Sequence, residues 1–113
     1  MDRNAKLKIL ESQIKLNLSE ILFTKVNNEK VKYFSITDVR VTKDFLNAKI
    51  YVNYFDKAKE EMYFSEFNKI KGFLRSELAK RLTMRKVPEL EFILDDLITK
   101  IEDLDQLIQK SKK

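Results

Sequence analysis

The 113-residue chain contains no cysteine, histidine or tryptophan, and only one glycine and one proline. Without cysteine it can form no disulfide, no thiolate nucleophile and no cysteine-based zinc site. Without histidine, Ser-His-Asp catalysis, histidine-ligated metals and a histidine pH switch are excluded. One glycine cannot supply the glycine-rich loops with which P-loop and dinucleotide-binding proteins approach phosphate. We therefore expect no cofactor, no metal ion and none of the common enzyme activities.

Long apolar runs are also absent. No run approaches the ~20 residues that a membrane-spanning helix needs, and residues 1–10 alternate charged and apolar residues, unlike the apolar stretch of a signal peptide. A cytoplasmic protein with no membrane partner is the natural expectation. The length suits one domain over residues 1–113. Hydrophobic residues make up 43% and charged residues 36% of the chain, which indicates a folded domain, with a frayed basic tail over about 109–113.

Positive charge is concentrated in one segment. The whole chain has 23 basic and 18 acidic residues, a net charge of +5. Residues 69–86 alone reach +6, because Glu77 is their only acidic residue. The basic residues there are Lys69, Lys71, Arg75, Lys80, Arg81, Arg85 and Lys86. Such a local concentration attracts polyanions, although a basic run taken alone more often forms a solvated helix surface.

The first half of the chain predicts a helix followed by a hairpin. Apolar residues recur at steps of three and four from Arg3 to about Val26, which is typical of an amphipathic helix. Residues 27–30 are polar turn formers, and an asparagine there can end the helix in the left-handed conformation. Residues 31–41 and 48–54 then alternate or are rich in β-branched and aromatic residues. They predict two antiparallel strands joined by a loop over 42–47.

The second half predicts two helices, a strand and a last helix. Asp56 is a suitable N-cap, and apolar steps of three and four continue to Thr83. A straight helix would place Lys71 among the apolar residues and turn Phe73 away, so we predict two helices that meet at Ile70-Lys71-Gly72. A straight helix that tolerates the glycine is the alternative. Val87-Pro88 ends this region. A strand over 90–94 and an amphipathic helix that begins at about Asp95 follow.

The predicted order is α-β-β-α-α-β-α, an α+β fold in which a three-stranded sheet carries its helices on one face. Two helices that meet at a glycine-bearing basic corner between strands suggest a type II KH topology. In that topology, the corner and the adjacent strand hold a single-stranded nucleic-acid backbone.

Three segments resemble the bacterial ribosome-binding factor A family. They are ITDVRVTKDFLNAKIYV at 36–52, GFLRSEL at 72–78 and LTMRKVPELEF at 82–92. The resemblance implies a KH-like domain in which an Ala-x-Gly kink between the helices replaces the usual glycine loop. Here Ile70 stands at the alanine position and Gly72 is retained. After the last strand, Leu97 and Ile101 stand where the family tends to have serine and glycine.

The resemblance also implies a function. Proteins of this family bind the free 30S subunit, contact its 16S rRNA, including the 5′-terminal helix, and support late maturation with processing of the 5′ end. They are associated with growth in the cold and have no catalytic activity. We therefore expect a monomeric, non-catalytic ribosome assembly factor.

Candidate RNA contacts follow from the basic corner. Arginine and lysine neutralise phosphate, and arginine does so with a fixed planar geometry. Gly72 is expected to carry the bend and to let the RNA backbone approach. The predicted RNA-binding residues are Lys71, Gly72, Arg75, Lys80, Arg81, Arg85, Lys86 and, in the hairpin loop, Lys43. Lys49 is a secondary candidate that is better explained as a solvated residue on a strand.

Other interpretations remain open. The acidic last helix, from Asp95 to Ile108, could hold a protein partner. A small enzyme built on carboxylates and lysines is disfavoured, because no such residues converge on a site and the Glu60-Glu61 and Asp95-Asp96 pairs suit helix N-termini. The aromatic residues Phe64, Phe67, Phe73 and Phe92 are predicted to lie in the core rather than to stack on bases, whereas Tyr51 is out of phase with its buried neighbours.

Overall fold

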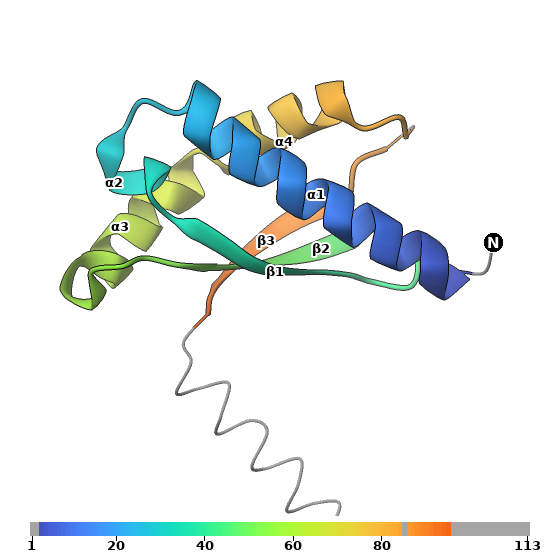
Figure 1. The fold of residues 1–113 in the computed structure, drawn as a ribbon, viewed down its shortest axis with the longest axis horizontal. Helices are drawn as coiled ribbons and strands as arrows, with labels where there is room; N and C mark the ends of the chain where they lie inside the picture. Colours follow the sequence, from blue (N-terminus) through green and yellow to red (C-terminus); the bar gives the residue numbers. More distant parts are fainter. Residues whose placement is uncertain (1–2, 85, 96–113) are drawn as a thin grey trace, which may run out of the picture.

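Three strands and four helices make up the part of the chain that the structure, a computed structural model, describes: residues 3–84 and 86–95 (Figure 1). The elements are α1 Arg3–Lys25, α2 Glu29–Lys32, β1 Ser35–Val41, β2 Asn47–Asn53, α3 Lys57–Lys69, α4 Lys71–Arg81 and β3 Glu89–Leu94. The predicted α+β class is confirmed. The predicted last helix and the frayed tail lie outside the described residues, except for Asp95, which follows β3.

The sheet has the order β1-β2-β3. β1 and β2 pair antiparallel, as the hairpin prediction requires, whereas β2 and β3 pair parallel. A parallel pair needs a crossover connection, which α3 and α4 provide. Ile50 lies at the centre of the sheet, opposite Val39 on β1 and Phe92 on β3, and all three are buried.

The helices cover one face of the sheet, with α1 lying across it (Figure 1). The predicted apolar stripe of α1 is buried in full: Leu7, Leu10, Ile14, Leu18, Ile21 and Leu22. On β2, Ala48, Ile50 and Val52 are buried, while Lys49 between them is exposed. The core is therefore made where this helical stripe meets the inward face of the strands, and the fold confirms the arrangement expected of a KH-like domain.

The segment after α1 differs from its prediction. Residues 29–32 form the short helix α2 instead of a turn, and the first strand begins at Ser35 rather than near Val31. Asn28 caps α2, since its side chain accepts a hydrogen bond from the Lys30 N–H at 3.0 Å. The left-handed asparagine cap is wrong, because Phe45 is the only non-glycine residue with a positive φ among the described residues. Asn28 therefore begins a helix as its N-cap rather than ending α1 in a left-handed conformation.

The hairpin loop is fixed by its own hydrogen bonds. The Asp44 carboxylate accepts from the Thr42 hydroxyl at 2.6 Å and from the Leu46 N–H at 3.0 Å. These bonds hold Phe45 at a φ of 64°, a conformation that costs a residue with a side chain about 1–2 kcal/mol. Leu46 then accepts a hydrogen bond from the Glu89 N–H at 2.9 Å, which places the loop beside the start of β3.

Within residues 3–84 and 86–95, no helix combines the length and the apolar character needed to cross a bilayer.

Candidate nucleic-acid interface

The corner between α3 and α4 is made at Ile70. Its φ of −100° and ψ of 13° lie in the bridge region, between helical and extended backbone. The Ile70 N–H donates to the Phe67 carbonyl at 3.2 Å, and the Ile70 carbonyl accepts from the Leu74 N–H at 2.9 Å. The two-helix prediction is confirmed, and the straight helix is wrong.

Gly72 lies in the first turn of α4 and has no special conformation. Its φ is not positive, and a Cβ added to it would meet nothing within 4 Å. The corner therefore does not need a glycine for its backbone geometry. What the missing side chain provides is open, exposed backbone at the surface.

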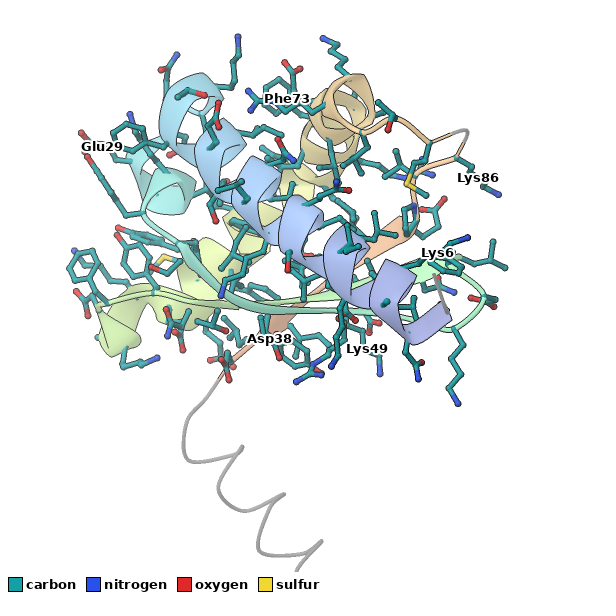
Figure 2. The ribbon with its side chains drawn as sticks, turned by 45° about the vertical axis from the view of Figure 1, so that its right-hand side comes forward. Lys6, Glu29, Asp38, Lys49, Phe73 and Lys86 are labelled. Atoms are coloured by element: carbon teal, nitrogen blue, oxygen red, sulfur yellow. The ribbon has the colours of Figure 1, made fainter. Side chains whose placement is uncertain are left out.

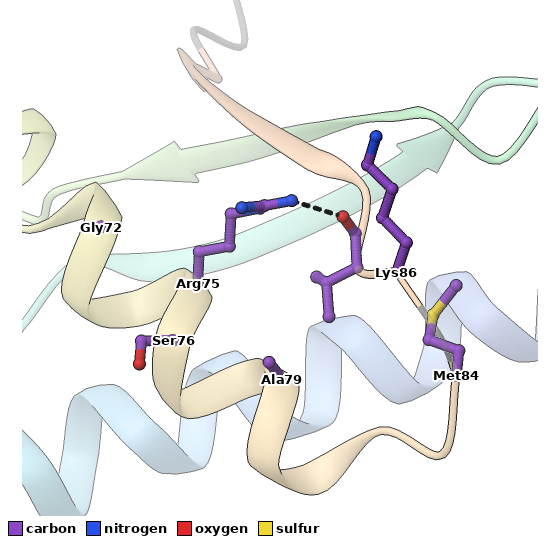
Figure 3. A pocket seen from close by; sticks show the side chains of 7 residues that line it. Gly72, Arg75, Ser76, Ala79, Met84 and Lys86 are labelled. Atoms are coloured by element: carbon purple, nitrogen blue, oxygen red, sulfur yellow. Dashed lines mark hydrogen bonds between the residues drawn. The ribbon is translucent and has the colours of Figure 1, made fainter.

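An open groove, which we call the α4 groove, runs beside this position (Figure 3). One wall is α4, and the other is the segment between α4 and β3. The groove has a volume of about 430 Å³ and is lined by Gly72, Arg75, Ser76, Ala79, Met84, Lys86 and Val87. Gly72, Ser76 and Ala79 are helix-spaced small residues that keep the α4 wall low, a signal the sequence prediction missed.

A smaller hollow of about 170 Å³ continues the groove toward the hairpin loop. It shares Met84, Lys86 and Val87 with the α4 groove and adds residues 44–46 of the loop. The predicted corner, the basic segment and the hairpin loop therefore border one continuous surface.

Arg75 makes hydrogen bonds and an ion pair with other residues of the protein. Its guanidinium donates to the Val87 carbonyl at 2.8 Å, the bond drawn in Figure 3, and to the Pro88 carbonyl at 3.3 Å. Its Nη2 also lies 3.3 Å from Oε1 of Glu89, and the side chain is 34% exposed. Hydrogen bonds from a charged donor are stronger than neutral ones. Arg75 thus ties α4 to the opposite wall of the groove.

Two further predicted RNA contacts are also paired. Arg81 lies 2.9 Å from a carboxylate oxygen of Glu20 and joins α4 to α1, with a side chain only 25% exposed. Lys80 lies 3.2 Å from Glu77, one turn earlier on α4, and its own side chain is 69% exposed whereas that of Glu77 is 17% exposed. Because the Lys80 side chain lies at the surface, the pair contributes little to stability, and the lysine can exchange Glu77 for another anion.

Lys71 and Lys86 remain available for an anion. No carboxylate of the described residues lies within 4 Å of either amine, and both residues reach solvent. Lys86 lines both the groove and its continuation, while Lys71 adjoins Gly72. Lys43 is exposed on the hairpin loop, and Lys49 is exposed on β2. Arg85 lies outside the described residues.

The aromatic residues divide between core and surface. Phe67 and Phe92 are buried and meet edge to face, with ring centroids 4.6 Å apart, and Phe64 is half-buried against the core. Phe73 is 44% exposed, so its predicted core position is wrong. Its neighbour Leu74 is turned into the core, and successive helical residues point about 100° apart.

Comparison with known protein families and sequences gives one consistent result. A family model described as ribosome-binding factor A matches residues 6–108. The ribosome-binding factor A of Thermodesulfovibrio yellowstonii is 32% identical over 111 residues, which covers 98% of this chain and 92% of the relative. That of Staphylococcus carnosus is 37% identical over 102 residues, with 89% of each chain covered.

Solved structures show the same similarity. The crystal structure of ribosome-binding factor A from Thermus thermophilus superposes with a TM-score of 0.68 at 28% identity, covering 78% of this chain and 94% of the other. A homology model of the Thermus thermophilus factor, fitted into a cryo-EM map of its complex with the 30S subunit, gives a TM-score of 0.64 at 29% identity. It covers 75% of this chain and 90% of the other.

Proposed function

Because this chain belongs to the ribosome-binding factor A family, we propose that it binds the free 30S subunit through its 16S rRNA. In this role it supports late maturation of the subunit, including processing at the 5′ end of the rRNA, whose terminal helix is part of the binding site. The Thermus thermophilus relative in complex with the 30S subunit supports the choice of partner. Ribosomes mature in the bacterial cytoplasm, so we place the protein there, as a monomer.

The observation that carries the RNA interface is the pair of uncompensated lysines at the α4 groove. Lys86 lines the groove and Lys71 stands at its α4 end, and neither amine pairs with a carboxylate among the described residues. When a lysine amine binds a phosphate, it releases cations that were condensed on the RNA, and an amine without a carboxylate partner does so without first breaking an ion pair. The low wall at Gly72 leaves room for a sugar-phosphate backbone to approach.

The predicted site residues then divide into two roles. Lys71, Lys86, Lys43 and Arg85 meet phosphates directly, and Lys80 joins them by exchanging Glu77 for phosphate. Arg75 and Arg81 act through the geometry of the groove, because their guanidinium groups hold α4 against β3 and α1. The protein holds RNA in one arrangement and performs no chemical step.

A salt titration of binding to purified free 30S subunits tests this proposal. We compare the wild type with Lys71→Glu/Lys86→Glu and with a matched control, Lys15→Glu/Lys25→Glu, which makes the same charge change at exposed positions of α1. The groove pair is expected to weaken binding about tenfold or more and to flatten the salt dependence, because two phosphate contacts are lost. The control pair is expected to change binding much less. Equal weakening by both pairs would show that only net charge matters and would contradict the α4 groove as the interface.

A further inference from the structure

A second hollow lies at the opposite end of the molecule from the α4 groove. It is formed where α2 and the start of α3 meet, and its volume is about 560 Å³. Its lining residues are Asn28, Glu29, Lys30, Tyr33, Tyr54, Phe55, Lys59 and Tyr63. Figure 2 shows Glu29 at one side of the molecule and Lys86 of the α4 groove at the other. We call this surface the aromatic hollow.

Two of its aromatic side chains are strongly exposed. Phe55 is 80% exposed and Tyr33 is 52% exposed, unlike the buried Phe34 and Phe67 nearby. Exposed aromatic rings that gather around a hollow are a common mark of a binding surface. Nothing in the packing of the core requires Phe55, since most of its ring faces solvent.

The floor of the hollow is formed by packed rings around Tyr54. Tyr54 is buried and its ring lies 4.7 Å from Phe55, 5.3 Å from Tyr63 and 5.0 Å from Phe34, centroid to centroid. The Tyr54 N–H donates to a Glu60 carboxylate oxygen at 2.9 Å. Burial, with the neighbouring Tyr63, raises the pKa of the Tyr54 phenol above its ordinary value, so it stays neutral and can donate a hydrogen bond. The exposed rings therefore rest on a packed support.

Cations flank these rings. Lys30 and Lys59 are exposed, and no carboxylate of the described residues lies within 4 Å of either amine. Glu60, the nearest acidic residue in sequence to Lys59, is engaged with the Tyr54 N–H and with Lys57 at 2.9 Å. Of the residues that line the hollow, only Glu29 is acidic. The surface thus combines flat aromatic faces with two amines that form no ion pair among the described residues, and with one carboxylate, that of Glu29.

We infer that the aromatic hollow binds an unpaired nucleotide, its base stacked on Phe55 or Tyr33 and its phosphates beside Lys30 and Lys59. This inference rests on the proposed function, because the nucleotide belongs to the same RNA partner. A nucleotide offers both an aromatic face and an anion, which is the combination that single-strand-binding proteins recognise. An apolar peptide would cover the rings but would leave both amines desolvated without a partner, which is costly.

The experiment uses the full chain and a single-stranded oligoribonucleotide about 10 nucleotides long that carries 2-aminopurine. The chain has no tryptophan, so the emission of the probe is read without that background. The variants are Phe55→Ala, Tyr33→Ala and Lys30→Ala/Lys59→Ala. Phe23→Ala is the matched control, because Phe23 is 73% exposed but does not line the hollow. Thermal melting confirms that each variant is folded.

The expected results separate stacking from charge. Phe55→Ala weakens oligonucleotide binding about five- to a hundredfold and reduces quenching of the probe, but leaves the salt dependence unchanged. Tyr33→Ala acts in the same direction. Lys30→Ala/Lys59→Ala reduces the slope of log affinity against log salt by about 1.4, the value for two single-strand phosphates. Phe23→Ala binds like the wild type.

Two results would overturn the inference. One is that Phe55→Ala and Tyr33→Ala both retain wild-type affinity and quenching. The other is that Phe23→Ala loses as much binding as Phe55→Ala, which would indicate general apolar adhesion. If the groove pair still weakens 30S binding in either case, the proposed function stands and only the aromatic hollow is withdrawn. If the wild type fails to bind 30S subunits in a salt-dependent way, the proposed function itself has failed.

Discussion

Individual basic residues of segment 69–86 have different roles, although the sequence presents them as one run. Four pair within the described residues: Lys69 with Glu66, Lys80 with Glu77, Arg81 with Glu20, and Arg75 with Glu89. Arg75 also donates to two backbone carbonyls. The attraction for a polyanion therefore comes from fewer cations than the net charge of the segment suggests.

Arg75 gives a residue-scale prediction. Arg75→Ala is expected to lower the free energy of unfolding by about 2 kcal/mol, because the Val87 and Pro88 carbonyls lose a charged donor. Lys80→Ala removes an ion pair on the same helix whose lysine side chain is 69% exposed, and it is the control, with an expected loss of about 0.5–1 kcal/mol. Urea unfolding followed by far-UV circular dichroism measures both. Equal stability of the two variants would mean that Arg75 does not support the groove wall.

These roles could be predicted from the sequence only in part. Charge counting located the basic segment, and the structure places several of its members, Gly72 and Lys86 among them, in the lining of an open groove that the sequence did not predict. It could not show that Arg81 faces Glu20, because these residues are remote in the sequence and meet only when α4 packs on α1. The pairing partners of a cation depend on tertiary contacts, which local pattern does not encode.

At the scale of elements, periodicity predicted the helices and strands well where an apolar stripe or an alternation extends over many residues. α1, β2 and β3 follow the predicted pattern closely, because one side of each is buried. Short α2 was missed, since its four residues show no periodicity and bury only Val31. Phe73 was misplaced because the start of α4 at Lys71 sets the rotation of the helix, and the sequence does not fix that start to one residue.

The α4 helix gives a prediction about Gly72. Gly72→Ala is expected to raise the free energy of unfolding by about 0.5–1 kcal/mol, because the position is helical and an added Cβ has open space. Gly72→Leu is expected to fold equally well, since leucine is also a good helix former. Its larger side chain, however, stands where we place the RNA backbone and is expected to weaken 30S binding.

Comparing the two variants separates an effect on the stability of α4 from an effect on how closely the RNA backbone can approach it. Thermal melting reports the stability of both, and sedimentation with 30S subunits reports their binding. If Gly72→Leu binds as tightly as Gly72→Ala, the RNA does not come close to this turn of α4. A loss of stability in Gly72→Ala would instead mean that the corner needs glycine.

At the scale of the whole molecule, the sheet and α1 form a rigid support with a proposed RNA contact at each end. β2 lies between its two partner strands and carries the most deeply buried strand residues, Ala48, Ile50 and Val52. Connections at one end build the α4 groove, and those at the other build the aromatic hollow. With both proposed contacts formed, a small domain of this kind would hold two separate points of one RNA at a fixed spacing, as the proposed function requires.

The central claim, that 16S rRNA lies against the α4 groove, is tested most directly by lysine protection. The full chain is acetylated briefly, alone and bound to free 30S subunits, and the reaction at each lysine is measured by mass spectrometry. We predict that Lys71 and Lys86 become strongly protected in the complex, while Lys15 and Lys25 on the exposed surface of α1 react as before. Unchanged reactivity of Lys71 and Lys86 in a stable complex, with protection of the α1 lysines instead, would contradict the account.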